Sequence, residues 1–107
     1  MKFAKSLVAV LAMAGFCLGA APFAGAADQG PVKIGVYLPL TGQNAFGGQL
    51  ELDGVRLAHK EMPKVLGRDV ELVVVDNKSD KVEAGNAVKR LIERDNVSAI
   101  IGTYGSP

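Results

Sequence analysis

Three apolar runs, each rich in β-branched residues, are the feature that most constrains how this chain can fold. They are Val32–Leu38, Val70–Val75 and Val97–Ile101. Their apolar residues are nearly continuous, which is typical of strands buried on both faces of a parallel sheet. Parallel strands need a long crossover connection, and a helix usually supplies it. The runs therefore predict an α/β fold in which helices separate the strands.

The interval before the third run has clear helical periodicity over Asp80–Arg94. Apolar residues recur there at i, i+3, i+4, i+7 and i+8, the pattern of one buried helix face. These residues are Ala84, Ala87, Val88, Leu91 and Ile92. Asp80 and Glu83 resemble a capping box, so the helix is expected to begin at this point.

The interval before the second run predicts a helix over Gln49–Met62, ending at Pro63. Its apolar stripe is less regular and consists of Leu50, Gly54, Leu57, Ala58 and Met62. A glycine inside a helix costs about 1 kcal/mol relative to alanine. We expect Gly54 to compensate for this cost by letting the helix approach the sheet closely.

The resulting order is β-α-β-α-β, a portion of a parallel doubly wound sheet. The sequence reaches GTYGSP directly after the third run, with no further helix to cover the sheet. We therefore expect an incomplete fold, the amino-terminal piece of a longer protein.

The first residues predict a secretory signal. Met1–Ala27 has a lysine-bearing start, an uncharged apolar run and the small-residue segment AGAA. Cleavage after Ala26 fits best, and cleavage after Ala27 is nearly as good. The alternative is an uncleaved membrane anchor, but the apolar run Leu7–Ala21 is shorter than the roughly 20 residues that span a bilayer. We expect a signal peptide over residues 1–26, a partial domain over 27–107 and a periplasmic location.

Composition excludes several kinds of partner and chemistry. Cys17 is the single cysteine and lies in the predicted signal, so the remainder has no disulfide and no thiol nucleophile. The chain has 12 basic and 11 acidic side chains, and without Lys2 and Lys5 the net charge becomes −1. These charges are interspersed and form no basic stripe, which argues against nucleic acid as a partner.

The glycine-rich stretch after the first run does not match a nucleotide-binding motif. Gly42 and Gly47 have the spacing of a phosphate-binding loop, but Gly48 and Gln49 occupy the positions that need Lys and Ser or Thr. A dinucleotide fingerprint is missing as well, because the second glycine is absent after Gly35.

Catalytic residues are sparse. His59 is the single histidine, and its place within the first helix favours a packing or surface role over that of a base. Asp76 with Asn77 supplies one carboxylate and one amide, so neither a carboxylate pair nor a metal-spaced set is present. We interpret this pair as a turn that tethers a neighbouring loop, and we expect no enzyme activity, no metal and no cofactor.

Small-molecule capture fits the strand ends better. In an open α/β sheet, ligands bind outside the carboxyl ends of the strands, and PLTGQNAFGG, DNKSD and GTYGSP meet at that edge. Thr103–Ser106 would lead into a next helix in a longer chain, and the unpaired backbone N–H groups at such a helix start suit a carboxylate. Ser106 would add a hydroxyl donor, Gly105 would allow close approach, and Phe46 and Tyr104 could form apolar walls. Thr41-Gly42 and Gly105-Ser106 could equally serve only as turn and cap residues.

Taken together, these segments resemble the periplasmic binding proteins of the leucine/isoleucine/valine type, which capture substrates for ATP-driven importers. The matching segments span nearly all of Val32–Pro107 and read IGVYLPLTGQNAFGG, DGVRLAHKEM, LGRDVELVVVDNKSD, AVKRLI and VSAIIGTYGSP. The resemblance implies the first lobe of a two-lobed type I periplasmic binding protein fold. It also implies closure around an amino acid, with branched-chain amino acids expected first, and a membrane ABC permease as partner.

The resemblance also implies roles for individual residues. The serine of a G-x-x-x-S stretch after the third strand binds the ligand carboxylate in such proteins, and Gly102–Ser106 matches this stretch. The role falls on Ser106, with Tyr104 and Gly105 lining the pocket. Phe46 is the nearest match to an aromatic residue that covers the ligand. The alternatives are an extracellular or amide-responsive sensor with the same fold, and an exported α/β enzyme.

Overall fold

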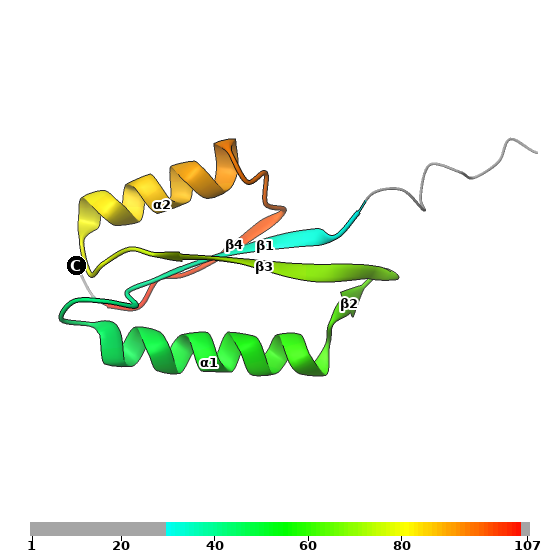
Figure 1. Ribbon diagram of the computed structural model, residues 1–107, viewed down its shortest axis with the longest axis horizontal. Helices are drawn as coiled ribbons and strands as arrows, with labels where there is room; N and C mark the ends of the chain where they lie inside the picture. Colours follow the sequence, from blue (N-terminus) through cyan, green and yellow to red (C-terminus); the bar gives the residue numbers. More distant parts are fainter. Residues whose placement is uncertain (1–29, 106–107) are drawn as a thin grey trace, which may run out of the picture.

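The computed structural model describes residues 30–105 and contains a four-stranded sheet with one helix on each face (Figure 1). The predicted signal peptide, residues 1–26, and Ser106 lie outside the described residues. The elements follow in the order β1 Val32–Leu38, α1 Ala45–Glu61, β2 Lys64–Val65, β3 Arg68–Asp76, α2 Lys81–Glu93 and β4 Ala99–Ile101.

The sheet order is β2-β3-β1-β4, and β1 pairs in parallel with both β3 and β4. The pairing runs from Val32 opposite Val70 to Leu38 opposite Asp76, and Val36 lies opposite Ile101. The predicted α/β class and parallel sheet are therefore confirmed. Because these three strands are parallel, their carboxyl ends meet at one edge of the sheet, on the left in Figure 1.

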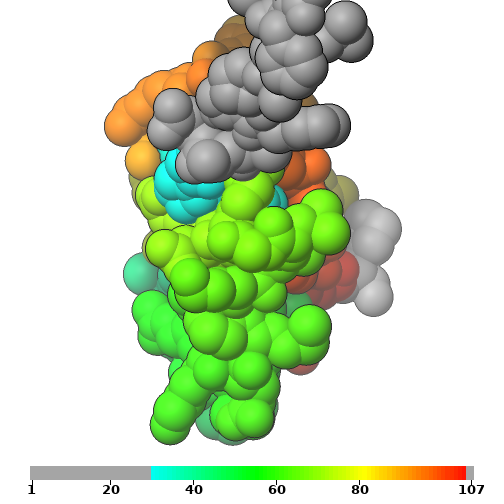
Figure 2. Space-filling model, turned by 90° about the vertical axis from the view of Figure 1, so that its right-hand side faces the viewer, coloured from blue at the N-terminus to red at the C-terminus, as the bar shows by residue number. Residues whose placement is uncertain are grey.

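β2 is an element that the sequence did not predict. It forms a two-residue antiparallel hairpin with the start of β3, pairing Lys64 with Asp69 and Val65 with Arg68. The turn residues Leu66 and Gly67 both have positive φ, at 51° and 73°, as tight hairpins favour. This corner belongs to the near surface in Figure 2. Two residues are too few to show any periodicity, so no pattern could reveal the strand.

The core centres on β1. Val36 and Leu38 are fully buried and form a cluster with Leu52 of α1. On the other face Leu91 of α2 is fully buried, and a Cβ added at Gly35 would lie 2.9 Å from its Cδ1. The predicted burial of the strands on both faces thus holds for β1.

The outer strands differ from that prediction. β3 is half-buried over most of its length, and two of the three residues of β4 are exposed. The exposure of β4 follows from its place in the sheet. In the described residues it is the outermost strand and has a partner strand on one side only.

The first helix begins earlier than predicted and buries a different face. α1 starts at Ala45 instead of Gln49, and its buried residues are Gly48 and Leu52. Two leucines of the predicted stripe face outward, with Leu50 58% and Leu57 61% exposed, whereas Gly54, Ala58 and Met62 border an open hollow beside the sheet. The inward row is formed by Gly48, Leu52, Val55 and His59, of which the first two are buried and the last two half-buried. Because this row contains a glycine and a histidine, hydrophobicity alone does not reveal it.

Gly54 also differs from the prediction. An added Cβ would meet nothing within 4 Å, so this glycine does not mediate a close approach to the sheet. Close approach occurs instead at Gly48, where a Cβ would overlap the carbonyl of Pro39. Gly54 borders an open apolar hollow of about 630 Å³ between α1 and the sheet, together with Met62 and Ile101.

The second helix follows the prediction closely. Asp80 is its N-cap, and one carboxylate oxygen accepts from the backbone N–H groups of Val82 at 2.8 Å and Glu83 at 2.9 Å. Ala87 and Leu91 are buried, as the periodicity required, whereas Ile92 is 55% exposed at the margin of the stripe. This cap fixes where the loop after β3 ends and the helix begins.

Candidate functional site

Three loops meet at the carboxyl ends of the parallel strands. They comprise residues 39–44 after β1, residues 77–80 after β3 and residues 102–105 after β4. Together with the first turns of α2 they line a hollow of about 320 Å³. Its polar lining includes Gln43, Asn44, Asn77, Ser79 and Thr103. The edge predicted from topology is therefore the place where polar side chains gather.

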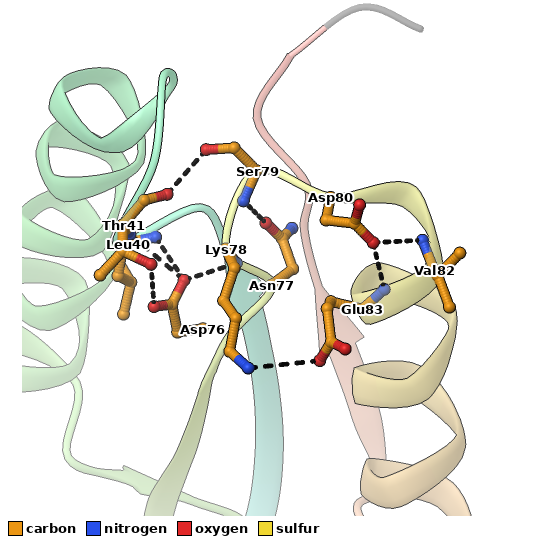
Figure 3. Close-up of polar contacts among 9 residues, drawn as sticks. All are labelled: Leu40, Thr41, Asp76, Asn77, Lys78, Ser79, Asp80, Val82 and Glu83. Carbon is orange, nitrogen blue, oxygen red and sulfur yellow. Dashed lines mark hydrogen bonds and ion pairs between the residues drawn. The ribbon is translucent and has the colours of Figure 1, made fainter.

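Asp76 ties the first loop to the second (Figure 3). Its Oδ1 accepts from the N–H groups of Leu40 at 2.9 Å, Thr41 at 3.3 Å and Lys78 at 2.7 Å, and its Oδ2 accepts from the Thr41 hydroxyl at 2.7 Å. Desolvation raises the pKa of this carboxyl, but the hydrogen bonds from Thr41, Lys78 and Leu40 outweigh it and the pKa is lowered. The carboxylate is thus a tether, as the Asp-Asn turn predicted.

Ser79 makes a second connection between the same loops. Its hydroxyl donates to the carbonyl of Thr41 at 2.7 Å and accepts from the N–H of Asn44 at 3.1 Å. The turn that places it is unusual, because Lys78 and Ser79 both have positive φ, at 56° and 60°. Gly42 has φ of 84°, and an added Cβ would lie 2.8 Å from the Ser79 hydroxyl, so only glycine fits there.

Asn77 ties in the third loop. Its side chain is 3% exposed, and its Nδ2 donates to the Thr103 hydroxyl at 2.7 Å. Its Oδ1 accepts from the N–H of Ser79 at 3.1 Å, so the amide is satisfied on both sides. Sequence reasoning missed this link. The available signal was topological, since Asn77 and Thr103 follow the ends of the two strands that flank β1.

Two of the four predicted ligand-binding residues line the hollow. Tyr104 and Gly105 line the hollow, with Tyr104 42% exposed and Gly105 at φ of 114°. Phe46 lies in the first turn of α1, is 80% exposed and is not part of the lining. Ser106 lies outside the described residues, so its carboxylate-binding role stays a prediction, as does the covering role of Phe46.

His59 lies at the other end of the sheet. Its Nε2 is 2.7 Å from the carbonyl oxygen of Val70, near the start of β3, and the side chain is half-buried. This geometry agrees with the predicted packing role. Within residues 30–105, no group of three His, Cys, Asp or Glu side chains could hold a metal ion. No helix in the same range is long and apolar enough to cross a bilayer.

A family model described as periplasmic binding protein matches residues 31–107. The chain belongs to the periplasmic binding protein family. Members of this family are binding proteins and not enzymes. No curated protein sequence matches the chain.

Solved structures of periplasmic binding proteins agree with the fold. A leucine binding protein, LivK, from Thermotoga maritima is 48% identical, with a TM-score of 0.69 over 70% of this chain and 21% of its own length. LivJ from Streptococcus pneumoniae in complex with isoleucine is 33% identical, with a TM-score of 0.66 over 67% of this chain and 22% of its own.

A third relative carries a different ligand. The solute binding protein of an ABC transporter from R. palustris, in complex with benzoate, is 31% identical, with a TM-score of 0.64 over 69% of this chain and 21% of its own. The chain therefore spans about a fifth of each of these type I periplasmic binding proteins and corresponds to part of their fold.

Proposed function

We propose that this chain supplies part of the ligand-binding cleft of an ABC importer's substrate-binding protein. The observation that carries the proposal is the hollow formed by three interlocked loops at the carboxyl ends of β1, β3 and β4. Ligand sites of open α/β sheets lie at this edge. The membership of the family and the names of the solved relatives support the same role.

The ligand in this proposal is a small molecule with a carboxylate, with branched-chain amino acids as the first candidates. The relatives named for leucine and isoleucine support an amino acid, and the benzoate complex shares only the carboxylate with them. The lining includes the side-chain amide of Asn44 and the hydroxyl of Thr103, which suit a polar head group. Ser106 would bind the carboxylate, and Phe46 would cover the ligand.

The proposal includes a location and a partner. A signal peptide over residues 1–26 would direct the protein to the periplasm, where it would deliver its ligand to a membrane ABC permease. The family description supports the periplasmic location.

Amide chemical-shift mapping tests the proposal. The protein purified after export is titrated with L-leucine, L-isoleucine, L-valine and benzoate in separate experiments. Shifts should concentrate on residues 40–44, 77–80 and 103–105, and Ser106→Ala should reduce them. A matched control, Leu66→Ala, changes a 93% exposed side chain at the β2–β3 turn and should leave them unchanged. Shifts confined to residues outside these loops, or no shifts with any ligand, would contradict the proposal.

A further inference from the structure

Gly47 lies directly beneath the ring of Tyr104. An added Cβ at Gly47 would overlap the ring atoms Cζ and Cε1 of Tyr104 and lie 2.7 Å from its hydroxyl oxygen. Gly47 belongs to the first turn of α1, and Tyr104 belongs to the loop after β4. The ring therefore rests on the backbone of α1 at a place that only a residue without a side chain leaves free.

The backbone of Gly47 does not itself require glycine. Its φ is not positive, and glycine is a poor residue inside a helix compared with alanine. Gly85 in α2 provides a contrast, because an added Cβ there would meet nothing within 4 Å. The requirement at position 47 is one of space, and the group that needs the space is the Tyr104 ring.

The position of this ring affects the shape of the hollow. Tyr104 is part of its lining, and so are Lys81 and Ala84 of α2 and the N-cap residue Asp80. α1 and α2 cover opposite faces of the sheet (Figure 1). A side chain at position 47 would push the ring away from α1, toward the part of the lining that α2 supplies, and would narrow the hollow.

We propose that Gly47 is a specificity-determining residue, which seats the Tyr104 ring against α1 and keeps the hollow wide enough for a branched side chain. The specificity role rests on the proposed ligand-binding function. Gly47 acts through Tyr104 and needs no contact with the ligand.

Thermal unfolding tests the contact between Gly47 and the Tyr104 ring without any ligand. Gly85→Ala is the matched control and should raise Tm by about 4–8 °C, the usual gain at an unobstructed helical glycine. Gly47→Ala should lower Tm, because the new methyl group displaces the ring. In a Tyr104→Ala background the ring is gone, and Gly47→Ala should raise Tm as the control does. A rise in Tm for Gly47→Ala with Tyr104 present would show that the Tyr104 ring does not pack against Gly47.

Calorimetric titration with L-leucine and glycine then tests specificity. Gly47→Ala should weaken L-leucine binding by about tenfold, as overpacking by one methyl group can do, and change glycine binding by less than about threefold. Gly85→Ala should change neither. Equal weakening of both ligands, or none, would overturn the specificity role. If the original protein binds neither ligand, the proposed function and the specificity role both fail. The contact between Gly47 and the Tyr104 ring is judged by the Tm values alone.

Discussion

Replacing Asp76 with asparagine should weaken the connection between the first two loops. The carboxylate accepts four hydrogen bonds, and the amide keeps one oxygen acceptor but presents an NH2 group to the Thr41 hydroxyl that now donates at 2.7 Å. A hydrogen bond to a charged group contributes about 1.5–3 kcal/mol net. Asp76 is only half-buried, so water offsets part of the loss, and we expect a cost of about 1–2 kcal/mol at pH 7.

The cost should depend on pH in a defined direction. The hydrogen bonds lower the pKa of Asp76 in the folded protein below its ordinary value of 3.8. The unfolded chain therefore takes up the proton first, and the contribution is complete above the ordinary value and is lost as pH falls through the lower folded value. The free-energy gap between the original protein and Asp76→Asn should accordingly narrow as pH is lowered from 7 toward 2.

Urea unfolding at several pH values measures this gap. Asp69→Asn is the matched control, because its carboxylate pairs with Lys64 at 3.2 Å while both side chains are well exposed. Such a pair is worth about 0–1 kcal/mol, so the control should change stability little at pH 7. If Asp76→Asn unfolds at the same urea concentration as the original protein at pH 7, or if the gap stays constant down to pH 2, the tether argument fails.

Three further substitutions test other parts of the structure. Thr103→Val should cost about 1–3 kcal/mol in urea unfolding because it removes the hydroxyl that accepts from the buried Nδ2 of Asn77, whereas Thr103→Ser should cost far less. Equal effects would contradict that link. Leu52→Ala should cost about 2–5 kcal/mol, since Leu52 is 2% exposed, and Leu57→Ala should stay within about 0.5 kcal/mol, since Leu57 is 61% exposed. The reverse ranking would mean that α1 packs by its other face. Gly54→Ala should stabilise by up to about 1 kcal/mol in thermal unfolding, and a loss would show that this position is occupied.

Much of the fold could be predicted because its signals are periodic. The apolar runs located β1, β3 and β4, and the repeat over α2 identified both its cap and its buried face. The buried face of α1 could not be found in this way. Its inward row contains Gly48 and His59, while Leu50 and Leu57 face outward, so hydrophobicity placed part of the predicted stripe on the wrong side of the helix.

The sequence predicted at which edge of the sheet the site lies, but not the hydrogen bonds that connect its three loops. Topology alone brings the ends of parallel strands together, and this located the three loops. The links between them depend on Lys78 and Ser79 adopting positive φ, which is uncommon for residues other than glycine. No local pattern predicts such a turn, because its cause lies in side chains that accept its N–H groups, namely Asp76 and Asn77.

The loops of the site are held by hydrogen bonds, whereas one face of α1 is apolar and open. The side chain of Asn77 joins the loop after β3 to the loop after β4 through Thr103, and short contacts from Asp76 and Ser79 join the loop after β3 to the loop after β1. In contrast, the hollow beside Gly54 leaves apolar side chains of α1 and the sheet uncovered. Hydrogen bonds, and not burial of that face, therefore hold the loops in place. It follows that covering the face should raise overall stability while leaving the geometry of the loops unchanged.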